Sequence, residues 1–293
     1  MSSIKKVVIP VAGLGTRGLP FTKEVPKELL PIIDTPTLHF IVEEVIAAGI
    51  EQVIFVTSKG KSILEDYFDP SPNLVSWLHK RGKDALAERI EKLGQMVEVI
   101  SVRQKEPLGL GHAVLCAAPV VGNEKFAVCL GDEIFPPWNP PGKVPALRRL
   151  VNLSSEQGGS VVGVVEIKAE DSQSYGMIDL GGGSMKNGVA KVHKTVEKPK
   201  PDDAPSPYAI IGRYVFEPGL FDELRATQAG VGGEIQLTDA MDRLARSGRL
   251  SAMLIDDCRY DIGNHLSFVI AQVDAAMRRP ELAEKLRTYL RTL

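Results

Sequence analysis

The residues best suited to chemistry in this sequence lie in a glycine-rich stretch near its start, VAGLGTRGLPFTKEVPK, at positions 11–27. Three basic side chains, Arg17, Lys23 and Lys27, fall within this stretch. Glycine lets backbone N–H groups come close to an anion, while Arg and Lys offer a planar fork and a point charge to phosphate oxygens. A single lysine is usually an ordinary exposed residue, but the group as a whole predicts a polyphosphate site.

The spacing of Gly13, Gly15 and Gly18 also fits the G-x-G-x-x-G pattern of dinucleotide-binding proteins. That pattern needs a helix that contains the third glycine and an acidic residue at the end of the following strand. Here Pro20 and Pro26 prevent a regular helix, and the following strand ends in FVTSKG, which contains no acidic residue. An oxidoreductase that uses NAD is therefore disfavoured.

The elements that must position this loop alternate between strand-like and helix-like segments from residue 4 to about residue 131. The alternation predicts right-handed βαβ units, a mostly parallel sheet covered by helices, and ligands at the carboxyl ends of the strands. At that edge we expect the glycine-rich loop, the segment RQKEPLGLGH and the segment GDEIFPPW. The expected strands are 5–11, 51–57, 96–102 and 125–130, and the expected helices are 37–49, about 61–68 and a longer one within 74–93.

The second half of the chain changes character, because short β-type runs are separated there by turn-rich segments. These runs predict additional strands that complete a mixed sheet. The proline- and acid-rich segment 199–207 is typical of an exposed mobile loop, and helical patterns return at 237–248 and from 266 onward. We therefore expect one α/β domain over residues 1–262 and a helical extension over residues 263–293 that could serve oligomerisation.

Composition narrows the class of partner. The chain of 293 residues is 44% hydrophobic and 25% charged, which is typical of a globular protein, and its net charge of −2 gives no general attraction to nucleic acid or to an anionic membrane. No apolar run is long enough to span a membrane, and Pro10 interrupts the first apolar run, so a signal peptide is not expected. The three cysteines are isolated and lack zinc spacing, which fits a reducing compartment. We expect a cytoplasmic protein.

The glycine-rich stretch, extended to AGLGTRGLPFTKEVPKELLPI, closely resembles the signature of the sugar-phosphate nucleotidylyltransferases. The resemblance continues in the same order along most of the chain, through PLGLGHAVLCA, CLGDEIF, YGMI, VEKP, IIGRYVF, GGEIQLTDA and YDIGN. This set is most similar to the bacterial UTP–glucose-1-phosphate uridylyltransferases. It implies a Rossmann-like nucleotidyltransferase fold with a mixed, mostly parallel sheet, and a homo-oligomer that is a dimer or a tetramer.

The resemblance also implies a reaction. Glucose 1-phosphate would attack the α-phosphorus of UTP in line, with Mg²⁺ as the cofactor, and the products would be UDP-glucose and pyrophosphate. Because the substrate phosphate is itself the nucleophile, the protein has to align two polyanions and stabilise the leaving pyrophosphate.

Motif by motif, the resemblance implies four sets of site residues. They are catalytic Arg17, Lys27 and Lys198; nucleotide-binding Ala12, Gly13, Gly15, Thr16, Gln104, Gly109 and Asp132; sugar-phosphate-binding Gly176, Glu197, Lys198 and Gly212; and metal-binding Asp132 and Asp261. Without the resemblance, the two aspartates would be ordinary turn residues and the Glu-Lys pair a surface ion pair. The amide of Gln104 can pair with a uracil edge through one donor and one acceptor.

Some positions depart from the family pattern. Glu133 stands where the family usually has a second aspartate, and Gly18 and Phe21 replace residues that are more usual in the loop. His112 could line the base pocket. The nearest alternatives are a thymidylyltransferase, an enzyme for another sugar 1-phosphate, and a non-catalytic regulatory paralogue that binds a nucleotide sugar. The retained basic and acidic residues argue against the last.

Overall fold

A sheet of ten strands forms the centre of the larger of two compact units in the chain. The computed structural model describes residues 4–138, 143–230 and 233–293. Unit 1 comprises Met1–Gly13, Val45–Leu130 and Val144–Asp256, and unit 2 comprises Leu14–Glu44, Gly131–Lys143 and Asp257–Leu293. The strands of the sheet are β1 (Lys6–Pro10), β4 (Gln52–Thr57), β5 (Glu98–Arg103), β6 (Phe126–Cys129), β8 (Ser160–Glu166), β9 (Gly176–Asp179), β10 (Val189–Lys191), β11 (Lys194–Glu197), β12 (Tyr208–Phe216) and β13 (Leu250–Leu254).

The sheet is mixed, and most of its strands run in one direction. Along the order β10-β13-β8-β12-β6-β1-β4-β5, the pairs β1–β4, β1–β6, β4–β5 and β13–β8 are parallel. Strand β12 is antiparallel to β6 and β8, and β10 is antiparallel to β13. An antiparallel branch is made by β9, which pairs with β12, and β11, which pairs with β9. The predicted mixed, mostly parallel sheet is confirmed.

Strand β1 explains how the sequence builds this sheet. Its residues Val7, Val8 and Ile9 are completely buried, as expected for a central strand covered on both faces. Since β1, β4, β5 and β6 are mutually parallel, their carboxyl ends lie at one edge of the sheet. Val11 and Gln104 follow two of these ends directly, so this is the edge at which an open α/β sheet binds its ligands.

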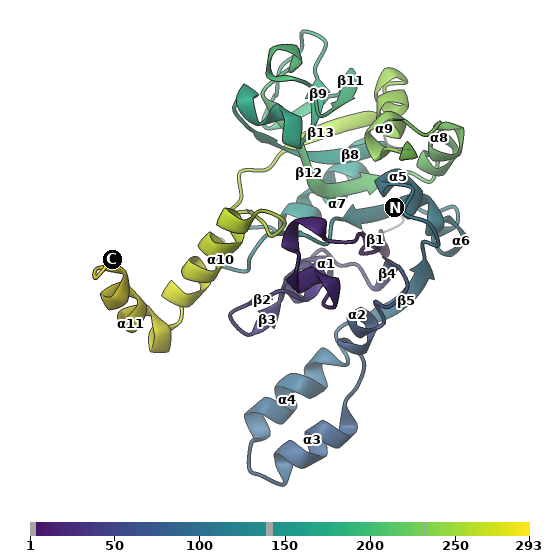
Figure 1. The fold of residues 1–293 in the computed structure, drawn as a ribbon. Helices are drawn as coiled ribbons and strands as arrows, with labels where there is room; N and C mark the ends of the chain where they lie inside the picture. Colours follow the sequence, from purple (N-terminus) through teal and green to yellow (C-terminus); the bar gives the residue numbers. More distant parts are fainter. Residues whose placement is uncertain (1–3, 139–142, 231–232) are drawn as a thin grey trace. The chain divides into compact units, whose positions relative to one another are not determined.

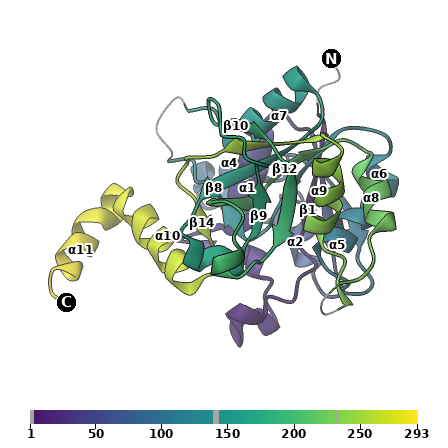
Figure 2. The ribbon, with the colours of Figure 1, turned by 90° about the horizontal axis from the view of Figure 1, so that it is seen from above.

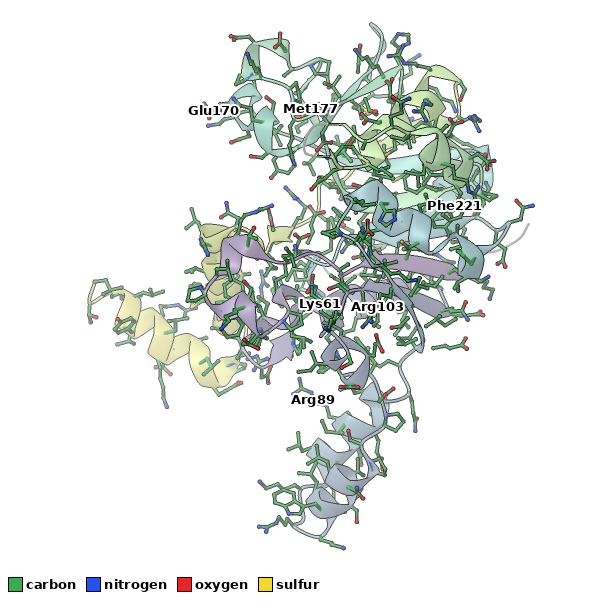
Figure 3. All side chains as sticks on the ribbon, turned by 45° about the vertical axis from the view of Figure 1, so that its right-hand side comes forward. Lys61, Arg89, Arg103, Glu170, Met177 and Phe221 are labelled. Carbon is green, nitrogen blue, oxygen red and sulfur yellow. The ribbon has the colours of Figure 1, made fainter. Side chains whose placement is uncertain are left out.

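Helices cover the sheet of unit 1. The helices α5 (Leu110–Cys116), α8 (Leu220–Ala226) and α9 (Leu237–Arg246) share one buried apolar cluster with the central strands. Figure 1 shows α8 and α9 side by side. Within the cluster, the ring of Phe221, which is labelled in Figure 3, stacks on that of Phe126 with 4.8 Å between the ring centroids. The apolar face of α7 (Ala146–Gln157) packs against β8 and β12. Two short helices, α2 (Ile63–Asp66) and α6 (Ala118–Val121), also belong to unit 1.

The helical region after α2 differs from the sequence prediction. Instead of one longer helix within 74–93, the chain forms α3 (Pro72–His79) and α4 (Asp84–Leu93), which Figure 1 shows as a helical hairpin. Gly82 between them has a φ of +67°, a left-handed conformation that ends a helix and that glycine adopts without strain. The residues of the turn, HKRGKD, include no proline, so Gly82 is the only helix-breaking residue there and the sequence pattern suggests a single element.

The proline-rich segment 199–207 is also more ordered than predicted. Pro199 is buried, and its carbonyl accepts a hydrogen bond of 2.9 Å from Ser172 Oγ, at the end of the 3₁₀ helix η4 (Ala169–Ser174). The prolines then form a second 3₁₀ turn, η5 (Pro201–Asp203), which η4 contacts. The expectation of an exposed mobile loop is therefore wrong for the start of this segment, because the buried Ser172 hydroxyl satisfies the Pro199 carbonyl.

Unit 2 contains little sheet. It holds the hairpin β2 (Pro31–Ile32) with β3 (Thr35–Pro36) and the antiparallel pair β7 (Glu133–Ile134) with β14 (Tyr260–Asp261). Helix α1 (Thr37–Ala47) starts in unit 2 and ends in unit 1. Figure 2 shows α10 (His265–Met277) and α11 (Pro280–Leu290) as consecutive helices with a bend between them, which confirms the predicted helical C-terminal region. In the described part of the chain, no helix has the length and apolar character needed to cross a membrane.

Candidate active site

The glycine-rich loop forms a series of tight turns. After Gly13 the chain makes three 3₁₀ turns, η1 (Thr16–Gly18), η2 (Phe21–Lys23) and η3 (Lys27–Leu29), so no α-helix begins here, as the prolines predict. Gly15 has a φ of +66°, and its carbonyl accepts a hydrogen bond of 2.7 Å from Thr22 Oγ1. A Cβ at Gly18 would lie only 2.6 Å from Thr22 Cγ2. The unusual glycine at position 18 therefore makes room for the threonine that ties the loop together.

Lys27 and Asp132 form an ion pair inside unit 2. Lys27 Nζ donates to Asp132 Oδ2 at 2.6 Å, and about a quarter of each side chain is exposed, 26% and 23%. Burial by itself lowers the pKa of the Lys27 ammonium, but the charge and hydrogen bond of Asp132 outweigh it and the pKa is raised. Burial likewise raises the pKa of the Asp132 carboxyl, but Lys27 overcomes it and the pKa is lowered. Both groups are therefore charged at neutral pH.

Arg17 and Asp261 lie close to this pair. The charge of Arg17 acts on both Lys27 and Asp132 by lowering their pKa values, and Arg17 Nη1 donates to the Gly263 carbonyl at 3.4 Å. Asp261 Oδ1 accepts from Gly263 N–H at 2.8 Å. A Cβ placed on Gly263 would be 3.0 Å from Asp261 Oδ1 and 3.1 Å from Arg17 Nη1. The glycine therefore lets a cation and a carboxylate approach the same point.

The strand pair β7–β14 brings the two predicted metal-binding aspartates near each other, because Asp132 directly precedes β7 and Asp261 lies on β14. Ile262 N–H donates to the Asp132 carbonyl at 2.7 Å, and Asp261 is paired directly with Glu133. Oxygen donors of this kind suit Mg²⁺, which proteins usually hold by one or two carboxylates together with substrate phosphates. Within the described residues, no group of three or more His, Cys, Asp and Glu side chains could hold a metal ion.

Glu133 has a partner that the sequence did not suggest. Its buried carboxylate is ion-paired with Arg259, which directly precedes β14. The glutamate at this unusual position therefore joins β7 to the segment that carries Asp261. The longer side chain of Glu, compared with Asp, supplies the reach across the ladder.

The predicted base-reading residues meet in unit 1. Gln104 is buried, and its Nε2 lies 3.1 Å from the Gly109 carbonyl and 3.1 Å from His112 Nδ1. A carbonyl can only accept, so this geometry fixes the side-chain NH₂ toward Gly109 and leaves the amide oxygen facing the other way. Gly109 has a φ of +96°, and a Cβ there would lie 2.8 Å from Glu234 Cβ. Only glycine fits this position.

The predicted sugar-phosphate residues of β9 and β11 also meet in unit 1. Glu197 is paired with Gly176 across the two strands, and a Cβ at Gly176 would lie 3.3 Å from Glu197 Oε2. Thr238 Oγ1 donates to Glu197 Oε2 at 2.5 Å, and Lys198 Nζ lies 3.4 Å from Glu197 Oε1. Lys198 has a φ of +45°, a conformation that a lysine rarely adopts. Such strain is often found at functional positions.

Gly212 lies elsewhere in this sheet, at a bulge of β12. The register of β12 against β8 shifts between Ile210 and Tyr214, and the Gly212 carbonyl accepts from Leu130 N–H at 2.9 Å and from Arg213 Nη1 at 2.8 Å. These bonds connect Gly212 to the end of β6. In the described part of the chain, Gly212 is not among the residues that join Gly176, Glu197 and Lys198.

The backbone on both sides of Ala12, at the start of the loop, is held by a residue that the sequence did not single out. Lys61 Nζ donates to the Val11 carbonyl at 2.5 Å and to the Gly13 carbonyl at 2.7 Å. Thr238, which binds Glu197, belongs to the motif GGEIQLTDA, so the resemblance could have indicated it. Lys61 carries no such signal, because its contacts lie 48 and 50 residues away in the sequence.

Comparisons with known proteins extend along the whole chain. A family model described as nucleotidyl transferase matches residues 6–278. A UTP–glucose-1-phosphate uridylyltransferase of Staphylococcus epidermidis is 44% identical over 294 residues, covering 100% of this chain and 99% of the relative. A Bacillus subtilis protein with the same name is 43% identical over 293 residues, covering 100% of this chain and 98% of the relative.

Two solved structures are similar over nearly the full length. A UDP-glucose pyrophosphorylase complexed with UDP-glucose has a TM-score of 0.84 and 37% identity, with 94% of this chain and 100% of that chain covered. A UTP-bound UGPase from Acinetobacter baumannii has a TM-score of 0.87 and 34% identity, with 99% of each chain covered. The similarity is therefore not confined to the glycine-rich loop.

Proposed function

This chain belongs to the UTP–glucose-1-phosphate uridylyltransferases of the nucleotidyl transferase family, and we propose that it makes UDP-glucose and pyrophosphate from UTP and α-D-glucose 1-phosphate. The observation that carries the proposal is the gathering of Arg17, Lys27, Asp132 and Asp261 in unit 2. Two cations and two carboxylates supply what a transfer between phosphate groups requires, which is charge neutralisation and oxygen ligands for a divalent cation.

The chemistry makes few demands on protein side chains. An oxygen of glucose 1-phosphate forms a bond to the α-phosphorus of UTP, and the bond from that phosphorus to the bridging oxygen of the β-phosphate breaks. Pyrophosphate leaves with the bridging oxygen and the bonding electron pair. The attacking oxygen is already anionic at neutral pH, so no side chain has to remove a proton from it. Alignment and charge stabilisation are the remaining tasks.

The glycine-rich loop is the proposed binder of the triphosphate. Backbone N–H groups from Ala12 to Thr16 would donate to its oxygens, and the Arg17 guanidinium would neutralise the charge that grows on the leaving pyrophosphate. Lys27 has a raised pKa and keeps its proton, so it would act as a fixed positive charge and not as a base. Its ammonium would exchange Asp132 for a phosphate oxygen when UTP binds.

Asp132 and Asp261 are the residues that we propose to hold Mg²⁺. When bound, this ion neutralises phosphate charge and polarises phosphoryl oxygens. The lowered pKa of Asp132 keeps its carboxylate ionised, as a ligand for a hard cation must be.

The two remaining groups would recognise the two ends of the product. Gln104 would accept from uracil N3–H through its amide oxygen, because its NH₂ faces Gly109 and His112. Glu197 would accept hydrogen bonds from sugar hydroxyls, and Lys198 would bind the phosphate of glucose 1-phosphate. Gly176 and Gly212 would allow the sugar to come close to the backbone.

We further propose that the protein works in the cytoplasm as a dimer or tetramer. Three exposed apolar residues of α10, Leu266, Val269 and Ile270, follow the helical spacing of one face and support a subunit contact there. The division into a catalytic domain over 1–262 and an extension over 263–293 stays part of this proposal.

The activity is tested by measuring pyrophosphate release with Mg²⁺ across a panel of UTP, dTTP, CTP and ATP, each with several sugar 1-phosphates. We expect the highest kcat/KM for UTP with glucose 1-phosphate. A higher kcat/KM for dTTP would favour the thymidylyltransferase alternative, and no release with any pair would favour the regulatory paralogue. Reduction of NAD by the same substrates is not expected.

A further inference from the structure

We propose that Lys61 is a positioning residue that shapes the start of the glycine-rich loop into its anion-binding form. Lys61 lies on the segment between β4 and α2 and is labelled in Figure 3. Its ammonium donates to the Val11 carbonyl at 2.5 Å and to the Gly13 carbonyl at 2.7 Å. The proposal rests on the proposed function, because the loop is assigned there to the triphosphate of UTP.

The direction of these two carbonyls decides the direction of two N–H groups. In a planar trans peptide the C=O and the N–H point in opposite directions. Since the carbonyls of Val11 and Gly13 converge on Lys61 Nζ, the N–H groups of the same peptides, those of Ala12 and Leu14, point away from it. Both N–H groups therefore lie on the side of the backbone that faces away from the ammonium, where they would donate to a bound anion.

The rest of the local structure supports this role. Val11 N–H donates to the Val56 carbonyl at 2.9 Å, so the sheet fixes the backbone up to Val11. From the Val11 carbonyl onward, the hydrogen bonds of Lys61 fix it. A Cβ at Gly13 would meet no atom within 4 Å, so the space next to this residue is open to a ligand. The positive charge of Lys61 also polarises both peptides, which makes their N–H groups better donors to a phosphate.

The test compares Lys61→Met, which keeps the length of the side chain but removes its donors, with Lys61→Arg, which retains them. Lys59→Met is the matched control, since Lys59 is an exposed lysine in the same turn. We expect Lys61→Met to raise the Kd for UTP about tenfold through the loss of charge-assisted hydrogen bonds. The KM for glucose 1-phosphate at saturating UTP should stay within about twofold, and Lys61→Arg should restore most of the UTP affinity.

Hydrogen exchange in the unliganded protein separates positioning from direct phosphate contact. If Lys61 shapes the loop, peptides that cover residues 11–18 exchange faster in Lys61→Met than in wild type before any UTP is added. Unchanged exchange together with weaker UTP binding would mean that Lys61 contacts the phosphate itself and would overturn the proposal. Unchanged UTP affinity, or an equal loss for both substrates, would overturn it as well.

Two further measurements keep the result interpretable. Should Lys61→Met fail to fold, Lys61→Gln keeps one neutral donor and should show a smaller change in the same direction for the UTP Kd and loop exchange. Binding and exchange need no turnover, so they report on Lys61 even if the wild-type protein makes no UDP-glucose. A wild-type protein that makes no UDP-glucose would contradict the proposed function, but the binding and exchange measurements would still test the role of Lys61.

Discussion

Lys27 Nζ and Asp132 Oδ2 are 2.6 Å apart, so a cation assigned to phosphate and a carboxylate assigned to a metal ion bind each other directly. The Asp132 carboxylate occupies the position where a phosphate oxygen would bind Lys27. The Lys27 ammonium likewise occupies the position where a metal ion would bind Asp132. If only one of UTP and Mg²⁺ arrived, one of the two partly buried charges would lose its partner, which is costly. With the proposed roles, the pair would favour binding of the nucleotide and the metal together.

Asp132→Asn should keep the fold but lose the proposed metal ligand. We expect kcat to fall by about 100-fold or more, because the stabilisation of transferring phosphate charge is lost. The measurement is steady-state turnover against Mg²⁺ concentration, with circular dichroism to verify folding. Asp69→Asn, at an exposed aspartate, is the control and should behave as wild type. A folded Asp132→Asn protein with full turnover would remove Asp132 from the site.

The ion pair also predicts how stability depends on pH. The pKa of Asp132 is lowered below its unfolded value of about 3.9, so its stabilising contribution is present above that value and is lost as pH falls through the folded pKa. The pKa of Lys27 is raised above about 10.4, so its contribution is present below that value and is lost as pH rises through the folded pKa.

Lys27→Met should therefore cost the most stability between about pH 5 and pH 9, and the cost should shrink at both extremes. Urea unfolding of both proteins from about pH 3 to pH 11 measures this difference. A difference that does not change with pH would show that the loss comes from packing and not from the charge pair.

Lys198 and Arg17 should act on different substrates. Asparagine tolerates the left-handed region that Lys198 occupies, so Lys198→Asn removes the charge with little strain on the backbone. We expect Lys198→Asn to raise the KM for glucose 1-phosphate about tenfold. Arg17→Ala should mainly weaken the binding of UTP and of pyrophosphate. Separate titrations of UTP and glucose 1-phosphate check this. Unaltered sugar-phosphate binding in Lys198→Asn would make the lysine a structural residue only.

Gln104 should discriminate uracil from cytosine. Cytosine lacks the N3–H that the amide oxygen would accept, so its binding leaves a buried acceptor unpaired, which costs about 1–3 kcal/mol. Thymine keeps the same edge and adds a methyl group, so dTTP should be rejected less strongly than CTP. Gln104→Leu should lower the UTP-to-CTP ratio of kcat/KM more than it changes saturation by glucose 1-phosphate. If the ratio is unchanged in a folded variant, the segment RQKEPLGLG does not read the base.

Glu133 should matter for stability more than for chemistry. Glu133→Gln removes the negative charge of the ion pair between buried Glu133 and partly buried Arg259, and breaking such a pair costs about 3 kcal/mol. We expect Tm to fall by about 5 °C or more while the dependence of turnover on Mg²⁺ stays that of wild type. A specific increase in the Mg²⁺ requirement, with Tm unchanged, would instead make Glu133 a metal ligand.

The sequence was sufficient where local chemistry decides the structure. The prolines after Gly18 exclude a helix in the loop, and the short β-branched segment at 5–11 predicts a buried strand; both are found. The residues of the motifs VEKP and YGMI also meet, because β11 and β9 pair in the register that sets Glu197 opposite Gly176.

What the sequence could not indicate depends on contacts between distant segments. Lys27 and Asp132 are 105 residues apart, and nothing in either motif shows that they bind each other. The pairing of Glu133 with Arg259 and that of Lys61 with the loop are equally remote. The division of the chain into two units is of the same kind, because unit 2 is assembled from three separate segments.

A short stretch before and within the first turn of α9 links the two recognition groups of unit 1. Ile235 N–H donates to the Leu108 carbonyl at 2.8 Å, and the Ile235 carbonyl accepts from Gly111 N–H at 2.8 Å. Three residues later, Thr238 donates a hydrogen bond to Glu197. Residues 235–238 thus fix the distance between the group assigned to the base and the group assigned to the sugar. Changes in this stretch should alter preferences for both ends of the product at once, so engineering a new sugar preference here would be expected to relax the choice of base.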